Sequence, residues 1–340
     1  MEPGAMKHVP ILAMDAGGTS CRAALCDAEG NILSYTKGSS SNYHNIGLQK
    51  TKETIIHVLE ELARPHGEPL KIAKAVIGMA GIDSKSAYQD LLTIIKSAFE
   101  KTRMQVEDIL LNNDGFITLL GFLGNRPGLL VISGTGSIVC GKDEKGALVR
   151  VGGWGHQLGD PGSGYHIGKA ALTHVFRSMD GQEPPTTLVP EILHELALDD
   201  LDHLVSWLYS DAYSIDKVAS LATVVFKLAH AKHPLATSIL LEAGKDLADA
   251  CHTAIQRLRL ENNAFDLVVA GGVLQKDHLV LGNMTERLAE NHPNFMLHQL
   301  KSEPIHCAIL YGLRSLNQYS DAAALRYEES LKQWEQDFIT

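Results

Sequence analysis

One pattern of strands and turns occurs twice in this sequence. Residues 11–33 and residues 129–149 each contain an apolar run, a Gly-Thr turn, a second apolar run, an acidic turn that ends in Gly, and a third apolar run. Thr135 follows Thr19 by 116 residues, and the same interval separates Asp27 from Asp143. We therefore expect two copies of one folding unit.

The two Gly-Thr turns predict a ligand that carries several phosphates. Gly lets backbone N–H groups approach anionic oxygens closely, and each turn adds a threonine hydroxyl. Two such hairpins can face each other across a cleft, so we expect the ligand to bind between the two halves of the chain.

Composition limits the class of protein. A length of 340 residues suggests two domains of ordinary size. The net charge of −10, without a run of Lys and Arg, argues against binding to nucleic acid or to an anionic membrane surface. No apolar run reaches the roughly 18 residues of a membrane span. The first residues lack the apolar stretch of a signal peptide, so we expect a cytoplasmic protein.

The cysteines and histidines form no ligand pattern. The five cysteines contain no C-x-x-C pair, and they are expected to be buried and reduced. His230 and His233 are one helical turn apart, but the polar sequence around them favours a solvated face over a metal site.

Hydrophobic periodicity predicts the same order of elements at the start of each half. The first half is expected to contain strands at 11–15, 22–26, 32–35, 75–79 and 109–111, and helices at 51–63, 86–101 and 116–123. The second half is expected to contain three strands within 129–151, a helical region at 163–259, a strand at 267–270, and a helix that begins at 308–313. Proline-containing loops are expected at 181–190 and 291–294. This is a duplicated mixed α/β architecture with a cleft between its domains.

Asp15 follows the first predicted strand and precedes the Gly17-Gly18-Thr19-Ser20 turn. A carboxylate beside a phosphate-binding turn suits a Mg²⁺ site, directly or through water. The alternative is an ordinary turn aspartate. The second turn at residues 133–137 favours the functional interpretation.

Asp114 ends the segment Asn112-Asn113-Asp114, where a predicted strand leads toward the second half. Ligands of such folds bind at the carboxyl ends of strands, and an Asp there can accept the proton of a substrate hydroxyl during phosphoryl transfer. The alternative is a helix N-cap, and the two roles are compatible.

Two further segments are rich in Gly. Residues 152–163 (G-G-W-G-H-Q-L-G-D-P-G-S) contain one of three tryptophans and suggest a backbone-lined pocket for a small polar ligand, with Asp160 binding hydroxyls and Ser163 capping the next helix. The alternative is an irregular structural loop. Gly271-Gly272 after a buried strand permits the close approach of a flat ligand such as adenine.

These motifs, in this order and spacing, resemble the N-acetylglucosamine kinase branch of the BadF/BadG/BcrA/BcrD ATPase family, within the actin-like and hexokinase-like ATPase superfamily. The motifs are D-A-G-G-T, N-N-D, I-S-G-T-G-S, G-G-W-G-H-x-x-G-D-x-G-S-x-Y and A-G-G-V. The resemblance covers residues 11 to about 316, and the G-W-G-H…G-D-x-G-S block is its most specific part.

The resemblance implies an ATP-dependent kinase that phosphorylates the primary hydroxyl of an amino sugar, N-acetylglucosamine above all. It implies two actin-like domains at 6–117 and 118–320, a helical tail at 321–340, and a homodimer formed through the helical second half. Asp114 would be the catalytic base and Asp15 would organise Mg²⁺. The implied ATP contacts are Gly17, Gly18, Thr19, Ser20, Gly134, Thr135, Gly136, Gly271 and Gly272. The implied sugar contacts are Asn42, Asp114, Ser137, Gly153, Trp154, Gly155 and Asp160.

Pro161 departs from the family pattern, which usually has Glu there. Proline removes a backbone donor and the charge of Glu, so the choice among N-acetylglucosamine, glucosamine, N-acetylmannosamine, N-acetylmuramic acid and glucose stays open. The main alternative is an activator-type ATPase that couples hydrolysis to a dehydratase or reductase partner. Such relatives hold an iron–sulfur cluster through paired cysteines, which this sequence lacks after the second turn.

Overall fold

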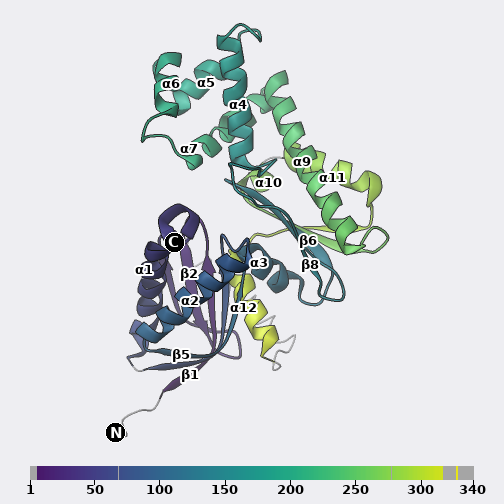
Figure 1. Cartoon of the computed structure of the whole chain (residues 1–340). Coiled ribbons are helices and arrows are strands. Elements are labelled where there is room, and N and C mark those ends of the chain that lie inside the picture. Colours follow the sequence, from purple (N-terminus) through teal and green to yellow (C-terminus); the bar gives the residue numbers. More distant parts are fainter. Residues whose placement is uncertain (1–5, 68, 277, 317–326, 328–340) are drawn as a thin grey trace. The chain divides into compact units, whose positions relative to one another are not determined.

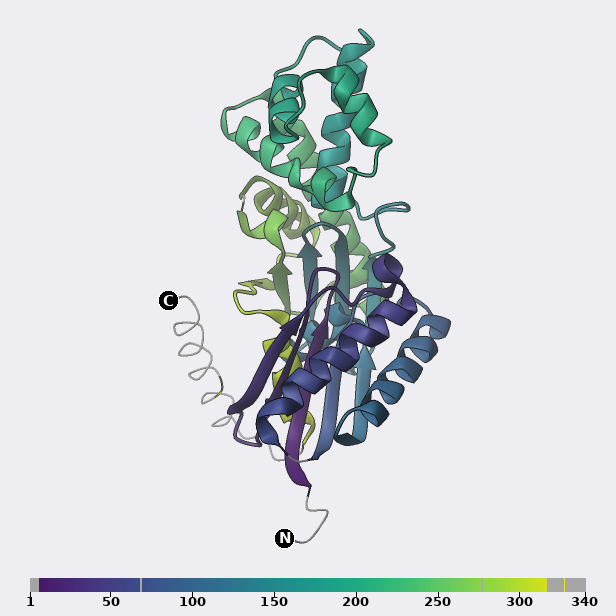
Figure 2. The ribbon, with the colours of Figure 1, turned by 90° about the vertical axis from the view of Figure 1, so that its left-hand side faces the viewer.

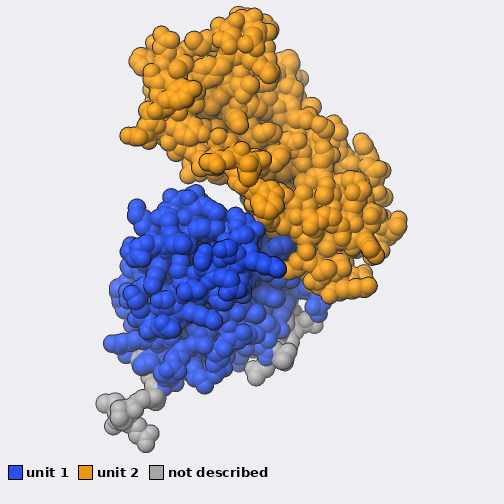
Figure 3. All heavy atoms as spheres, viewed as in Figure 1, with its two compact units in different colours: residues 1–125, 302–340 blue, residues 126–301 orange. Residues whose placement is uncertain are grey.

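The computed structural model describes residues 6–67, 69–276, 278–316 and 327. Figure 1 shows the chain as a ribbon. The residues form two compact units (Figure 3), unit 1 with residues 1–125 and 302–340 and unit 2 with residues 126–301. Each unit contains one five-stranded sheet. No helix in the described ranges is both long and apolar enough to span a membrane.

Unit 1 is built on a mixed sheet of order β3-β2-β1-β4-β5. β1 pairs antiparallel with β2 and parallel with β4. Its strands are β1 (Lys7–Ala16), β2 (Cys21–Cys26), β3 (Ile32–Gly38), β4 (Leu70–Met79) and β5 (Met104–Asn112). Its helices are α1 (Tyr43–Ala63), the 3-10 helix η1 (Arg64–His66), α2 (Lys85–Lys101), α3 (Asp114–Leu123) and α12 (Pro304–Ser315). Figure 2 shows α1 and α2 side by side across one face of this sheet.

Unit 2 repeats this topology, with the order β10-β9-β6-β7-β8. Its strands are β6 (Gly128–Ser133), β7 (Ser137–Lys142), β8 (Leu148–Gly152), β9 (Phe265–Ala270) and β10 (Phe295–Gln299). Between β8 and β9 lie α4 (Gly164–Met179), α5 (Leu188–Glu195), α6 (Leu201–Leu208), α7 (Ile215–Ser220), α8 (Ala222–His230) and α9 (Pro234–Leu258), and α10 (Gly272–Lys276) and α11 (His278–Asn291) connect β9 to β10. The sheets of the two units therefore match strand for strand.

The duplication extends to single hydrogen bonds. In the acidic turn of the first copy, Asp27 Oδ1 accepts the N–H groups two and four residues later, at 3.1 and 2.8 Å. In the second copy, Asp143 Oδ1 accepts the equivalent N–H groups at 2.9 and 2.7 Å. Gly30 and Gly146 both have a positive φ, of 91° and 84°. The repeat read from the sequence is thus a repeat of structure.

The Gly-Thr turns differ by one residue. Ala16 pairs with Cys21, whereas Ser133 pairs with Ser137, so the first turn has one residue more than the second. Residues before the turn are therefore shifted by one position between the two copies, so that Ala16 corresponds to Ser133 and Asp15 of β1 corresponds to Ile132 of β6. The duplication therefore supplies a strand-end carboxylate in unit 1 alone.

Most predicted elements are confirmed, with longer bounds. α1 begins at Tyr43 because Asn42 caps it, and its backbone is non-helical at Gly47 (φ 80°), just before the predicted start of the helix. The prediction missed α10, α11 and β10. The segment before α5 is a loop as predicted, but Pro190 lies inside the helix, where its missing N–H does no harm in the first turn.

α12 belongs to unit 1 although it follows unit 2 in the chain. It packs against α3 and β1 and completes an apolar cluster with Ile11, Ile117 and Ile309. The compact units accordingly divide the chain at 125 and 301, whereas the boundaries implied by the family resemblance lie at 117 and 320. The expected helical tail at 321–340 lies outside the described residues, apart from Tyr327.

The contact between α3 and α12 requires Gly121. A β-carbon at this position would overlap the backbone carbonyl of Cys307 in α12, and Arg314 of α12 donates a hydrogen bond to the Gly121 carbonyl. Because the obstacle is backbone, a side chain cannot rotate away to make room.

We expect Gly121→Ala to lower the free energy of unfolding by about 1–3 kcal/mol, since overpacking of a closed contact forces the two helices apart. Gly282→Ala in α11 is the matched control, because no atom outside the adjoining backbone of its own helix lies within 4 Å of the added methyl group. The control should stabilise the protein by up to about 1 kcal/mol. Urea unfolding followed by circular dichroism would measure both, and equal effects of the two variants would contradict this account.

Candidate active site

In unit 1 the predicted site residues gather at the carboxyl ends of β1, β4 and β5. Asp15 is in register with Gly78 of β4, and Gly78 is in register with Asn112 of β5. A β-carbon on Gly78 would lie 3.2 Å from Asp114 Cα and from Ile117 Cβ. The bare backbone of Gly78 therefore lets the first turn of α3 pack directly against the sheet, on the side that Asp15 faces.

Asp15 is 6% exposed and lies among other charged groups. Arg22 Nη1 is 3.5 Å from Asp15 Oδ2, and Arg22 Nη2 is 3.0 Å from Glu303 Oε1. Burial and the charges of Asp114 and Glu303 raise the pKa of Asp15 to about 7, although Arg22 opposes the shift. A bound cation would relieve this unfavourable burial of negative charge.

Asp114 is the first residue of α3, not its cap. Asn113 is the N-cap and accepts the Gly115 N–H on Oδ1 at 3.0 Å. Asp114 Oδ1 accepts the same N–H at 2.9 Å. Burial raises the pKa of Asp114 while the hydrogen bond from Gly115 lowers it. A carboxylate with a raised pKa is a better proton acceptor than an exposed one.

The first Gly-Thr turn is closed by a Gly17 N–H bond to the Ser20 carbonyl at 3.0 Å, and Thr19 at its tip is exposed. The segment before α1 lies against this turn, since the Ser41 N–H bonds the Gly17 carbonyl at 3.3 Å. Asn42 Oδ1 caps α1 by accepting the His44 N–H at 3.0 Å. Its Nδ2 would lie 3.9 Å from a β-carbon on Gly18. The structure thus brings Asn42 beside the turn, with its amide nitrogen toward Gly18.

In unit 2 the second Gly-Thr turn is held by the N-terminus of α4. The Gly164 N–H donates to the Gly134 carbonyl at 2.7 Å, and the Tyr165 N–H donates to the Thr135 carbonyl at 3.1 Å. The turn closes on itself through a bond from the Gly134 N–H to the Gly136 carbonyl at 2.9 Å. Four backbone groups of the turn are therefore used in hydrogen bonds that fix its shape.

Gly271 packs against the same turn. Its φ is 93°, and a β-carbon there would overlap the Ser133 carbonyl and lie 3.0 Å from the Gly134 nitrogen. Gly272 begins α10 and has open space around its α-carbon. The structure brings the predicted adenosine residues next to the predicted phosphate turn. Packing against this turn by itself also requires a glycine at position 271.

The Gly-rich segment between β8 and α4 has a conformational explanation. Gly152, Gly153, Gly155 and Gly162 all have φ between 69° and 85°, and Asp160 has φ of 55°. Left-handed backbone favours Gly, and Asp is among the side chains that tolerate it. The many glycines that suggested a pocket are thus also required by the left-handed backbone conformation of this segment.

Asp160 fastens this segment to the turn. Its Oδ1 accepts the Gly155 N–H at 3.1 Å, and its Oδ2 would lie 2.6 Å from a β-carbon on Gly136. Burial raises the pKa of Asp160, while backbone N–H groups of Gly155, Ser137 and Trp154 lower it. The carboxylate therefore organises the loop, whatever ligand it also contacts.

The neighbouring side chains differ in exposure. Ser137 donates its hydroxyl to the Pro161 carbonyl at 2.8 Å and is buried. Trp154 is 59% exposed, and the Arg150 guanidinium lies 4.0 Å above its ring. Ser163 caps α4 as predicted, accepting the His166 N–H at 3.1 Å. An oriented, exposed indole beside backbone-fixed groups is a suitable platform for one face of a sugar ring.

Sequence reasoning missed three charged residues. Arg22 contacts Asp15 directly, and Glu303 is linked to Asp15 through Arg22. Asp216 of α7 accepts the Thr135 hydroxyl at 3.2 Å. Arg22 carried a signal, because it is the one charged residue within an otherwise apolar strand. Glu303 and Asp216 lie far from their partners in sequence, and nothing local identifies them.

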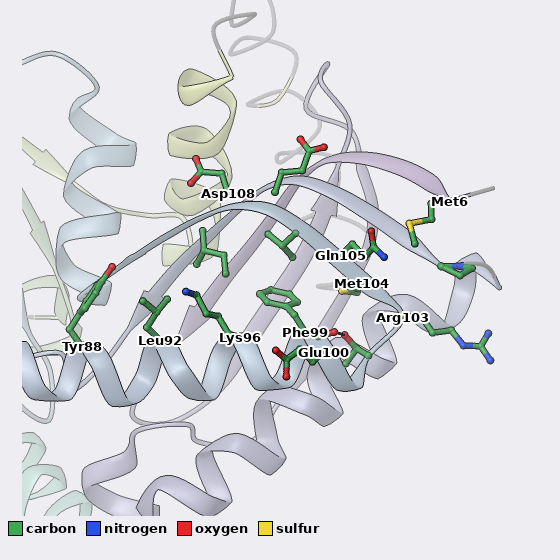
Figure 4. A pocket seen from close by; sticks show the side chains of 15 residues that line it. Met6, Tyr88, Leu92, Lys96, Phe99, Glu100, Arg103, Met104, Gln105 and Asp108 are labelled. Atoms are coloured by element: carbon green, nitrogen blue, oxygen red, sulfur yellow. Dashed lines mark hydrogen bonds between the residues drawn. The ribbon is translucent and has the colours of Figure 1, made fainter. Parts of the chain in front are cut away.

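Other candidate sites gain no support. All five cysteines are free and buried. His233 caps α9, accepting the Ala236 N–H at 3.3 Å. Among the described residues there is no group of three or more His, Cys, Asp or Glu side chains arranged to hold a metal ion. A cavity of about 900 Å³ lies between α2 and β5, next to Tyr88, Leu92 and Phe99 (Figure 4), and none of the predicted site residues lines it.

Comparison with known proteins identifies relatives of this chain over most of its length. It is 30% identical over 316 residues to an N-acetyl-D-glucosamine kinase of Dictyostelium discoideum, covering 90% of this chain and 98% of the relative. It is also 30% identical over 314 residues to an N-acetylmuramic acid/N-acetylglucosamine kinase of Clostridium acetobutylicum, with the same coverage. A glucosamine kinase of Vibrio cholerae is 27% identical over 240 residues, covering 69% of this chain and 77% of the relative.

Solved structures share the fold. A structure from Chromobacterium violaceum, whose name gives N-acetylglucosamine kinase as a proposed activity, matches with a TM-score of 0.70 and 23% identity over 89% of this chain and 98% of that one. A ROK family glucokinase of Streptomyces griseus matches with a TM-score of 0.53 and 16% identity over 90% of this chain and 98% of that one. The two-domain, actin-like fold expected from the sequence is thereby confirmed. The model of the BadF/BadG/BcrA/BcrD ATPase family matches residues 12–312, and the chain belongs to this family.

Proposed function

We propose that this protein is an ATP-dependent kinase that phosphorylates the primary hydroxyl of an amino sugar, N-acetylglucosamine above all. The observation that carries the proposal is the packing of Asp114 against Gly78, which places a half-buried carboxylate near the buried Asp15 at the end of the sheet. The activities named for the relatives in Dictyostelium and Clostridium support the choice of sugar.

Unit 1 would supply the proton acceptor and the carboxylate for the cation. Asp114 Oδ1 is held by the Gly115 N–H, which leaves Oδ2 to accept the proton of the sugar hydroxyl. That hydroxyl oxygen then attacks the terminal phosphorus of ATP, and the bond from phosphorus to the bridging oxygen of ADP breaks. Asp15 would bind Mg²⁺ of the nucleotide, directly or through water.

Unit 2 would bind the phosphates and the sugar. The Gly134-Thr135-Gly136 turn offers a shape already fixed by α4, and this preorganisation is what phosphoryl transfer needs from a protein. Trp154 offers an apolar wall for an N-acetyl group, and Asp160 fixes the backbone beside it. Ser137 of unit 2 and Asn42 of unit 1 complete the proposed sugar contacts, each already held by a hydrogen bond to backbone.

Three features remain part of the proposal. Magnesium and a homodimeric assembly are expected from the family resemblance, and a cytoplasmic location is the expectation from the sequence. Gel filtration with light scattering would measure the mass in solution against the 36.9 kDa of one chain.

ADP release should depend on one amino sugar. We expect release with Mg²⁺–ATP and N-acetylglucosamine, and slower release with glucosamine, N-acetylmannosamine, N-acetylmuramic acid and glucose. Mass spectrometry of the product should show the 6-phosphate. ADP release that is the same with and without every sugar would contradict the kinase assignment and favour an activator-type ATPase with a protein client.

Asp114→Asn should lower kcat by at least about 100-fold, because general-base catalysis typically contributes 10²–10⁴. Sugar binding, measured by calorimetry, should persist, since the amide keeps the size of the side chain. Asn113→Ser is the control, because serine also caps helices and Asn113 lies next to the proposed base. Near-normal turnover of Asp114→Asn would show that another group accepts the proton.

The pH dependence of kcat/KM for ATP should report the ionisation of Asp15. Its pKa is raised to about 7, so below this pH the free protein carries a protonated Asp15 that cannot bind a cation. We therefore expect kcat/KM for ATP to fall as the pH drops below about 7, while kcat at saturating Mg²⁺–ATP persists to lower pH, because the cation favours the ionised form.

Arg22→Gln should move the midpoint of the kcat/KM profile to higher pH, since Arg22 is the group that lowers the pKa of Asp15. A kcat/KM that stays constant down to pH 5 would contradict the assignment of Asp15 to the nucleotide.

A further inference from the structure

The two repeated threonines differ in their partners. Thr135 donates its hydroxyl to Asp216 Oδ1 at 3.2 Å, and both residues are exposed. Thr19 is also exposed, but within the described residues its hydroxyl makes no hydrogen bond. The carboxylate at the second turn is thus not a product of the duplication. It comes from the helical segment that unit 2 carries between β8 and β9.

The backbone of the helix that carries Asp216 is fixed by its contacts within unit 2. Ser214 caps α7, since its Oγ accepts the Lys217 N–H at 3.2 Å, and Val218 of α7 is buried. A β-carbon on Gly168 of α4 would overlap the Val218 carbonyl, so α4 and α7 are in close backbone contact. Because the start of α4 also binds the carbonyls of the turn, Thr135 and Asp216 are both fixed to one helix.

This pairing has a chemical consequence for a phosphate ligand. A threonine hydroxyl has one proton to donate, and an ionised carboxylate only accepts hydrogen bonds. Phosphate oxygens are acceptors as well, so a phosphate at Thr135 competes with Asp216 for the same proton. The two negative charges also repel each other. A divalent cation on the phosphates removes most of this repulsion.

We propose that Asp216 is a specificity-determining residue of the nucleotide site, which disfavours polyphosphate without a divalent cation and so selects Mg²⁺–ATP over metal-free ATP. This inference rests on the proposed function for the role of the turn. Selection of this kind keeps the site from being occupied by a nucleotide form that cannot react.

The test is the affinity of the intact protein for ATP, measured by calorimetry without sugar, once in excess Mg²⁺ and once in EDTA. Asp216→Asn keeps the shape and removes the charge. We expect metal-free ATP to bind about tenfold more tightly to this variant, the effect of one unit charge a few ångströms away in a solvated site. Binding of Mg²⁺–ATP should change less than about threefold. Asp211→Asn, an exposed position just before α7, is the control for net charge and should change neither affinity.

Three results would overturn the proposal. Weaker binding of Mg²⁺–ATP to Asp216→Asn would make Asp216 a ligand of the cation. Equal affinities of Asp216→Asn and Asp211→Asn for metal-free ATP would remove any role of this carboxylate. A wild-type protein that binds both forms of ATP equally, or neither, would show no selection. Sugar-dependent ADP release tests the proposed function separately, since selective binding of Mg²⁺–ATP without sugar phosphorylation would reject the kinase and keep this inference.

Discussion

The close approach of α3 to the sheet at Gly78 is the contact on which the chemistry of unit 1 depends. Since Gly78 has no side chain, the first turn of α3 lies against the end of β4, and Asp114 comes near Asp15. The nearby charge of Asp114 adds to the cost of ionising the buried Asp15. Arg22 compensates in part, and the remaining negative charge is what a metal-bound nucleotide can neutralise.

Unit 2 uses the same strand order with different groups around its turn. Its first strand has Ile132 where unit 1 has Asp15, so no carboxylate ends β6. Its Gly-Thr turn is instead held by the N-terminus of α4, and Asp160 ties the next loop to it. One duplicated topology thus carries a carboxylate at the end of its first strand in unit 1, whereas the carboxylates near the turn of unit 2 come from the segments that follow β8.

Local patterns predicted most of the fold because each signal lies within one element. The apolar runs of β1 and β6, the helical faces of α1 and α2, and the Ser163 cap are all visible over a few residues. β10 was missed because its five residues mix apolar and polar side chains and leave Met296 and Leu297 exposed. The catalytic and binding roles remain proposals, since they depend on ligands and not on the fold.

The sequence by itself determined that the chain is duplicated, where its turns lie, and which family it resembles, because repeats, Gly positions and apolar periods are local properties of the chain. Only the tertiary structure decided that α12 returns to unit 1, that Arg22 stands between Asp15 and Glu303, and that Asp216 accepts the Thr135 hydroxyl. These contacts join residues that are distant in sequence. Packing alone brings them together, and packing also sets the burial that governs their charge.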